Sequence, residues 1–371
     1  MQLNFWNRTP TPIRTEDREI RSARAMQRPR FARLRDVVAA GLVLVSLLAS
    51  TNGRALIFPS PEFEPTSPVP PDFPYWENVT QRRYEGPSVI YLGNGWALTA
   101  RHVGMGEIFL EGRAYPPDIR SHHTLLNLNG TAADAMVFRL TADSELPDLP
   151  LLPLAREPLQ PGEDVLVIGF GRGREKVIEW MDPNDPHQRQ RFAFAWSRSG
   201  RKRWGTNRIV SNHQVLVQKN WRTHAVTFRF DPPDSPTATP HEAQAAIGDS
   251  GGAVFVKRDG RWLLAGMMTS VSARLRTPKE TSAYGDTTYA ADVSFYRSEI
   301  IRWTRPDCAN EEDDDGDGKI DFPLDPDCHA PTDPSERRVR LLTEAQAWLI
   351  GIVGFGAVLI SIFRVQKRRP N

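Results

Sequence analysis

Three short stretches of this sequence carry side chains that could together perform acyl transfer. Residues 248–252, Gly-Asp-Ser-Gly-Gly, place Ser250 in a glycine-rich turn directly before an apolar run. A serine hydroxyl is a weak nucleophile unless a neighbouring base takes its proton and a third group orients that base. His102, after an apolar stretch, and Asp134, before another, are candidates for these two roles. The alternative for Ser250 alone is a turn that opens a strand, and for the other two a loop histidine and a turn cap.

These stretches resemble the trypsin/chymotrypsin family of serine peptidases. The family's histidine ends a Leu-Thr-Ala-Ala-His pattern, which residues 98–102 match except at Arg101. Its aspartate heads an apolar strand, matched by residues 134–140, and its Gly-Asp-Ser-Gly-Gly motif is matched in full by residues 248–252. The order His, Asp, Ser along the chain is also that of the family, and the resemblance spans residues 76–303.

The resemblance implies a chymotrypsin-like double β-barrel and a role for each residue of the motifs. Ser250 would attack the substrate carbonyl, His102 would act as general base and then acid, and Asp134 would orient the histidine. The backbone N–H groups of Gly248 and Ser250 would form the oxyanion hole. The family's usual activation pairs a newly cleaved N-terminus with the aspartate beside the serine. No such partner is evident for Asp249, so an internal group or a different maturation is implied.

The same resemblance assigns three residues to substrate binding. Gln244 corresponds to the base of the specificity pocket, Thr269 to the residue whose backbone pairs with the peptide, and Val271 to a position in the pocket wall. An uncharged base and a valine wall imply small or medium apolar substrate side chains rather than Lys or Arg. Glu242 lies two residues from Gln244, and a shift of alignment would reverse that expectation.

The elements that must position these residues are strands. Residues 75–303 contain short apolar runs, rich in β-branched and aromatic residues, that end at turn signals such as Asn94-Gly95 and Asp259-Gly260. Only residues 294–303 have a helical pattern. The sequence therefore predicts an all-β barrel domain with a C-terminal helix. Residues 56–74 are rich in proline and predict an extended linker before this domain.

The N-terminal segment has the features of an export signal. Residues 37–49 form an apolar stretch, too short to span a bilayer, after an arginine-rich segment. Ala55 is a candidate cleavage position, so residues 1–55 form the expected signal region. Met26 begins a version of ordinary signal-peptide length and is a candidate start of translation. An uncleaved anchor is the alternative for this stretch.

A second apolar segment near the C-terminus predicts a membrane anchor. Residues 345–363 carry no charge and precede the basic tail 364–371, which predicts a transmembrane helix with a cytoplasmic tail. A buried core helix is the alternative. We therefore expect an exported protein, anchored in the cell membrane, whose peptidase domain lies on the extracytoplasmic side.

The charge balance argues against a nucleic-acid partner. The chain has 47 Lys and Arg against 45 Asp and Glu, a net charge of +2. Residues 171–208 are locally basic and contain three tryptophans. We expect a solvated loop there, and a surface that binds lipid head groups or an acidic polymer is the alternative.

An acidic stretch, residues 307–329, follows the predicted domain and suggests a calcium loop. Carboxylates at alternate positions before a glycine can wrap around Ca²⁺, and the candidate ligands are Asp313, Asp315, Asp317 and Asp321. The stretch resembles an EF-hand-like or thrombospondin type 3-like loop, but it has Leu324 at the twelfth position, with Asp325 as a candidate substitute. Cys308 and Cys328 bracket it, and export favours a disulfide between them. The alternative is an acidic, disordered stalk.

The motifs together predict an exported, membrane-anchored serine endopeptidase that acts on proteins or peptides. No cofactor is expected for catalysis, and Ca²⁺ is expected only in the acidic loop. One alternative is a pseudoprotease, a surface binding module whose three residues are present but not aligned. Another is an esterase on the same scaffold.

Overall fold

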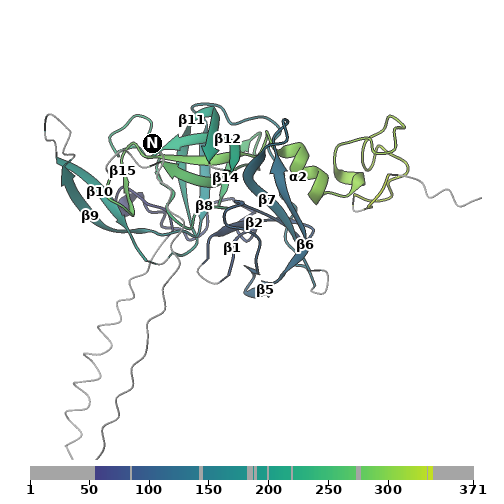
Figure 1. The fold of residues 1–371 in the computed structure, drawn as a ribbon, viewed down its shortest axis with the longest axis horizontal. Coiled ribbons are helices and arrows are strands. Elements are labelled where there is room, and N and C mark those ends of the chain that lie inside the picture. The colour runs from purple at the N-terminus through teal and green to yellow at the C-terminus, as the bar shows by residue number, and fades with distance from the viewer. Residues whose placement is uncertain are drawn as a thin grey trace, which may run out of the picture. The chain divides into compact units, whose positions relative to one another are not determined.

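The computed structural model describes residues 55–336 apart from positions 84–85, 142–144, 182–186, 188–189, 199, 219, 273–276 and 332. This part of the chain is mostly β-structure, as expected, and it contains one α-helix, α2 (Arg297–Thr304) (Figure 1). The helix ends one residue after its predicted end and begins three residues after its predicted start. Ile300 and Ile301 are buried, so α2 packs its apolar side against the strands.

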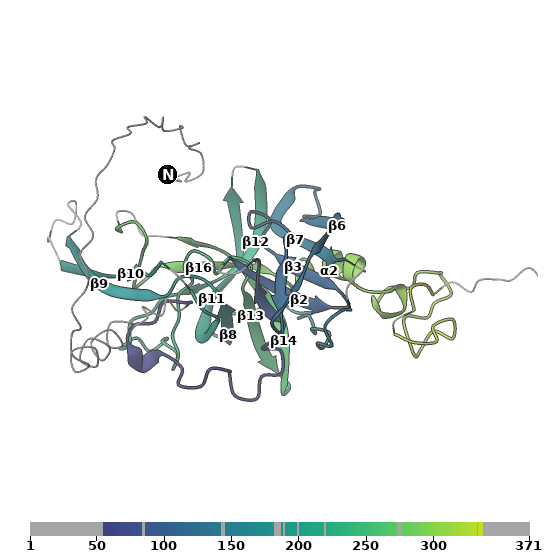
Figure 2. The ribbon, with the colours of Figure 1, turned by 90° about the horizontal axis from the view of Figure 1, so that it is seen from below.

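Six strands form a closed antiparallel barrel in the order β11-β12-β16-β14-β13-β8 (Figures 1 and 2). They are β8 (Asp164–Gly169), β11 (Arg203–Gln218), β12 (Trp221–Arg229), β13 (Ala253–Arg258), β14 (Arg261–Ser272) and β16 (Thr287–Asp292). The predicted turn at Asp259-Gly260 joins β13 to β14. Its two residues have φ of 49° and 74°, the left-handed backbone that a two-residue hairpin requires.

The other half of the domain is a five-stranded sheet and a separate hairpin. The sheet order is β1-β2-β3-β7-β6, and the hairpin is β4-β5. These strands are β1 (Val79–Gln81), β2 (Ser88–Gly93), β3 (Trp96–Thr99), β4 (Ile108–Leu110), β5 (Arg113–Tyr115), β6 (Pro117–Leu126) and β7 (Ala132–Leu140). The structure differs here from the expected second closed barrel. Strands β4 and β5 have three residues each, and among the described residues the β-pairing between the sheet and the hairpin is limited to the isolated bridge Arg82–Ile108.

A shared core joins the barrel to the sheet. Successive residues of a strand face opposite sides, so β8 contributes Val165 and Val167 to one cluster and Leu166 and Ile168 to another. The second cluster also contains residues of β2, β3 and β7, among them Ile90, Leu98 and Val137. Burial of these side chains holds the two halves together, and the candidate site lies where they meet.

A three-stranded sheet, β15-β10-β9, replaces the loop expected in the basic stretch. Its strands are β9 (Arg174–Met181), β10 (Gln190–Trp196) and β15 (Thr281–Ala283), and Figure 1 shows β9 and β10 reaching away from the barrel. Two of the three tryptophans in this stretch, Trp196 and Trp204, have contacts within the domain. Trp204 is buried in the core, and Trp196 donates a hydrogen bond through Nε1 to Ser282 Oγ. The expectation of a loop is therefore wrong for most of residues 171–208, although most side chains of β9 are exposed to solvent as expected.

The proline-rich segment, expected to be an extended linker, is anchored to the domain at its beginning and near its end, while much of its middle is exposed. Leu56, Ile57 and Phe58 are fully buried, and the backbone of Ile57 pairs with that of Gln244 in both directions. A short 3₁₀ turn, η1 (Pro61–Phe63), follows, and Phe73 packs edge-on against Phe255 with ring centroids 4.8 Å apart. The reason is the apolar residues between the prolines, because burying them offsets the cost of ordering the segment.

The two expected membrane-directed segments, 37–49 and 345–363, lie outside the described residues. Among those that are described, no helix is long and apolar enough to cross a bilayer. After α2 the chain makes a 3₁₀ turn, η2 (Asp307–Ala309), and continues without regular structure to residue 336. The expected disulfide between Cys308 and Cys328 is present, with Cα atoms 5.6 Å apart.

Candidate active site

The turn after β3 and the start of β7 bring His102 and Asp134 into contact. Asp134 is fully buried, and its Oδ2 lies 2.7 Å from His102 Nδ1. Its Oδ1 accepts a second hydrogen bond, 2.9 Å long, from the backbone N–H of His102. Because the carboxylate favours a proton on Nδ1, the other ring nitrogen, Nε2, is left as an acceptor. This is the tautomer that a general base needs.

Thr223, on β12 of the barrel, supports this pair from the other half of the domain. Its Oγ1 accepts a hydrogen bond of 2.9 Å from the backbone N–H of Asp134, and the side chain is fully buried. No pattern in the sequence marks Thr223, since its role depends on β12 lying next to β7. The contact ties the position of Asp134 to the packing of the two halves.

Ser250 lies in the turn that leads into β13, and the glycines around it are required by close packing. Gly248 and Gly251 have φ of 95° and 83°, which side chains disfavour. A Cβ on Gly251 would lie 2.0 Å from Ser88 O and 2.4 Å from Thr99 Oγ1. The serine turn therefore rests directly on β2 and on the end of β3, the strand that leads to His102.

The hydroxyl of Ser250 and the ring of His102 do not share a hydrogen bond in the described structure. Ser250 Oγ instead donates to the carbonyl oxygen of Thr269 over 3.4 Å, a long contact. Catalytic hydrogen bonds are often long or poorly aligned without substrate and shorten in the complex. The geometry therefore presents an oriented histidine and a half-buried serine, and catalysis requires a contact between them.

The two backbone groups expected to form an oxyanion hole have no competing partner. Neither the N–H of Gly248 nor that of Ser250 donates a hydrogen bond within residues that the structure describes. The carbonyl of Gly248 is held from behind, because it accepts 3.1 Å hydrogen bonds from both the backbone N–H and the Oγ of Ser88. This leaves both N–H donors available to a developing oxyanion.

Asp249 points away from the other side chains of the motif and into the protein. Its Oδ1 accepts from Gly171 N at 2.7 Å and its Oδ2 accepts from Ala246 N at 2.8 Å. Complete burial raises the pKa of this carboxyl to about 7, although hydrogen bonds from these two N–H groups and from that of Leu56 lower it. Backbone N–H groups, including that of Leu56 in the proline-rich segment, thus bind the carboxylate for which the sequence showed no partner.

The raised pKa predicts a pH-dependent stability that Asp249→Asn should reduce. Folding raises the pKa from 3.8 to about 7, so the stabilising contribution is complete below pH ~4 and is lost as the pH rises through ~7. For the uncleaved chain, in which Leu56 offers Asp249 an uncharged backbone N–H, we expect the free energy of unfolding, measured with urea, to fall across this range by on the order of a few kcal/mol more in the wild type than in Asp249→Asn. Asp259→Asn, in an exposed turn, is the matched control. Equal slopes for wild type and Asp249→Asn would refute the assignment.

The three residues expected to bind substrate lie at different depths. Gln244 is 1 % exposed, and its Oε1 has no hydrogen-bond partner in the described part of the chain. Thr269 lies at a register irregularity in β14, which turns its carbonyl toward Ser250. Val271 is half-buried and packs against the barrel core. Of the three, the structure brings only Thr269 into contact with Ser250.

Two neighbours of these residues change the picture of the pocket. Glu242, the alternative pocket base, is fully buried. It accepts hydrogen bonds from the Asn207 side-chain amide and from the backbone N–H groups of Asp231 and Thr239, and burial raises its pKa to about 7. It is therefore an internal carboxyl bound to its own scaffold. Ile247, which no motif marked, is 53 % exposed directly before Gly248 and offers an apolar contact beside the serine turn.

The acidic stretch brings together three of its four candidate ligands. The carboxylates of Asp313, Asp315 and Asp317 are exposed and approach within 4.8 Å of one another. Asp321 is not part of this group. Its Oδ1 and Oδ2 accept hydrogen bonds from the backbone N–H groups of Asn310 and Glu311. Asp325, the candidate substitute, lies elsewhere and is buried.

Comparison with known proteins gives structural likenesses only. No family model matches the chain, and no curated protein matches it. Among solved structures, it is similar to a mutant of human heparin binding protein (14% identity, TM-score 0.40, 67% of this chain and 93% of that one). It is also similar to kallikrein-related peptidase 10 in complex with Zn²⁺ (15%, 0.38, 64% and 98%). A third likeness is to neuropsin, a serine protease of mouse brain (16%, 0.39, 62% and 96%). Because these TM-scores are 0.40 or lower, only the geometry of the site supports a statement about its chemistry.

Proposed function

We propose that this protein is a serine endopeptidase. The observation that carries the proposal is the buried Asp134 carboxylate, bonded to both the backbone N–H and the Nδ1 of His102. It is supported by Ser250, which lies in a turn where the N–H groups of Gly248 and Ser250 have no partner among the described residues. A buried carboxylate that orients a histidine in this way has a clear chemical use and no evident need for stability alone.

The reaction follows from these groups. His102 Nε2 takes the proton from Ser250 Oγ as the oxygen attacks the substrate carbonyl, and the N–H groups of Gly248 and Ser250 stabilise the resulting oxyanion. The protonated histidine, stabilised by Asp134, then gives its proton to the leaving amine, which produces an acyl-enzyme. A water molecule activated by His102 releases the acid product and restores the serine.

A fluorophosphonate probe tests the proposal, because it reacts only with a serine that has been activated as a nucleophile. The full chain in detergent is expected to be labelled, and the same chain after heat denaturation is not. Absence of labelling in protein with a cooperative melting transition would contradict the peptidase and favour the pseudoprotease. The missing hydrogen bond between Ser250 and His102 is the observation that supports this second candidate. Turnover of an ester but not of the matching peptide would identify an esterase.

We expect the substrate side chain beside Ser250 to be apolar. The exposed Ile247 and the half-buried Val271 support this expectation, and Glu242 binds internal donors. Protein or peptide substrates are proposed on the same grounds, and no nucleic-acid partner is proposed.

We also propose that the protein is exported, anchored in the membrane and cleaved near its N-terminus. Export through the signal at residues 37–49, with a membrane anchor at 345–363, would place the peptidase domain outside the cytoplasm. Cleavage after Ala55 would make Leu56 the first residue, and its backbone nitrogen already contributes a hydrogen bond to Asp249. An ammonium there would pair with the buried carboxylate and lower its pKa. N-terminal sequencing of the exported protein should begin at Leu56, and a start beyond residue 58 would contradict this proposal.

We further propose that Asp313, Asp315 and Asp317 bind Ca²⁺. Their mutual approach and the oxygen chemistry of carboxylates support it. Asp321 is not included among the ligands, because its carboxylate does not lie within the group that the other three form.

A further inference from the structure

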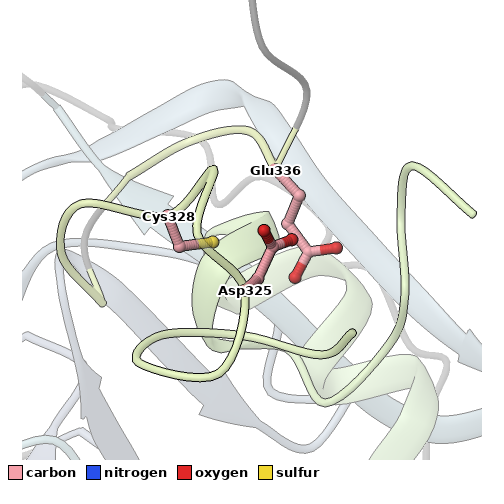
Figure 3. A group of neighbouring side chains, drawn as sticks. All are labelled: Asp325, Cys328 and Glu336. Atoms are coloured by element: carbon pink, nitrogen blue, oxygen red, sulfur yellow. The ribbon is translucent and has the colours of Figure 1, made fainter. Parts of the chain in front are cut away.

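Two carboxylates are buried in the segment that follows the domain, apart from the exposed aspartates of the acidic stretch. Asp325 is 1 % exposed and Glu336 is fully buried, although neither lies in a helix or strand. Figure 3 shows the two carboxyl groups turned toward each other beside Cys328. One oxygen of each carboxylate and the Cys328 sulfur lie within 4.8 Å of one another.

The hydrogen bonds around this pair leave one oxygen without a partner. Glu336 accepts from the backbone N–H groups of Asp321 and Asp314, at 2.9 and 2.7 Å. Asp325 Oδ1 accepts from Asp327 N at 2.7 Å. Asp325 Oδ2 is buried and has no hydrogen-bond partner, and no Lys, Arg or His within the described residues forms an ion pair with either carboxylate.

Such an arrangement is costly unless a positive charge lies between the two groups. A buried charged group that loses its hydration must be repaid by a hydrogen bond, an ion pair or a metal. Two neighbouring carboxylates also repel each other in a low-dielectric environment. An unpartnered oxygen that faces a second buried carboxylate is therefore the donor set expected of a cation site.

We propose that Asp325 and Glu336 bind a calcium ion. Hard cations such as Ca²⁺ take carboxylate oxygens at about 2.3–2.6 Å, so two ligand oxygens of one ion lie up to about 5 Å apart, which this pair satisfies. Cys328 is bonded to Cys308 and offers no thiolate, which disfavours a zinc-type site. Backbone carbonyls and water would complete the coordination shell, as they commonly do for Ca²⁺.

This site is separate from the one proposed at Asp313, Asp315 and Asp317. Those three carboxylates are exposed, whereas Asp325 and Glu336 are enclosed and lie beside the disulfide. A cation here would join residue 336 to the loop closed by the disulfide and so hold the end of the described chain against it. The inference does not depend on the proposed peptidase activity.

Equilibrium dialysis with radioactive calcium, on the full chain in detergent, tests the binding. The variant Asp313→Asn/Asp315→Asn/Asp317→Asn isolates the buried site and is expected to bind one Ca²⁺ per chain. Adding Asp325→Asn and Glu336→Gln is expected to abolish that binding. No calcium bound by the triple variant, or the same amount bound by the quintuple variant, would overturn the proposal.

The rate at which a reductant cleaves the Cys308–Cys328 disulfide gives a second, local measurement of calcium binding. It does not rely on an absence of bound calcium as its result. At a calcium concentration about nine times Kd, linkage predicts about tenfold slower reduction of the wild type and of the triple variant than in chelator. Asp325→Asn removes the repulsion between the carboxylates, so in chelator it should be reduced more slowly than the wild type and should not respond to calcium. Reduction of Asp325→Asn faster than wild type in chelator, or equal rates with and without calcium in the triple variant, would refute the site.

Discussion

Replacing Ser250 by alanine is expected to abolish fluorophosphonate labelling and to lower kcat for peptide hydrolysis by about 10⁵-fold or more. The variant removes the only group in the proposed mechanism that forms a bond with the substrate. The oxyanion donors and the substrate contacts remain, so a small residual rate over solution is expected. The measurement is initial-rate kinetics on the full chain, with labelling followed in parallel.

Two comparisons decide what this result means. Ser67→Ala alters an exposed serine whose hydroxyl donates to the carbonyl of Val69 and whose backbone contact with Trp204 is kept by alanine, so it should retain full labelling and activity. Thermal melting should show that Ser250→Ala is folded, because its hydroxyl makes only one long hydrogen bond in the structure. Persistent hydrolysis by folded Ser250→Ala would remove Ser250 from the mechanism.

Asp134→Asn is expected to lower kcat by about 10⁴-fold while KM changes little. The amide can donate to Nδ1 of His102, which favours the proton on Nε2 and so removes the base that Ser250 requires. The substrate contacts near Thr269 and Ile247 are untouched, and this is why the effect should fall on kcat. The Asp259→Asn surface variant should match the wild type in both parameters.

The cost of Asp134→Asn to stability separates this role from a structural one. The asparagine keeps one oxygen for the backbone N–H of His102, and Thr223 still accepts from the backbone of residue 134. We therefore expect a small change in melting temperature beside a large change in kcat. A large loss of stability with a proportionate loss of active protein would contradict an orienting role for Asp134.

Local signals in the sequence predicted much of the fold correctly. The Asn94-Gly95 and Asp259-Gly260 turns form the hairpins expected of them, because residues in such turns need positive φ and these dipeptides tolerate it. The single helix of the described part also lies where its pattern predicts it. Each of these features depends on residues close together in the chain, which is why a single sequence contains the information.

The expectations that differ from the structure depended on composition. Proline content predicted an extended linker at residues 56–74, but four large apolar residues within it, Leu56, Ile57, Phe58 and Phe73, are buried. Basic content predicted a loop in residues 171–208, but β9, β10 and the start of β11 lie there. The average polarity of a segment does not show a few apolar side chains within it. Whether those side chains are buried depends on surfaces formed by strands that are distant in the sequence.

By itself, the sequence determined which residues can do chemistry: a serine between glycines, a histidine, an aspartate, and a cysteine pair around an acidic stretch. The tertiary structure alone decided their partners. It set Thr223 behind Asp134, enclosed Asp249 with the N–H groups of Gly171 and Leu56, and separated buried Asp325 and Glu336 from the exposed aspartates. The physical reason is that spacing along the chain specifies type and order, whereas burial, charge compensation and pKa depend on groups that only folding brings together.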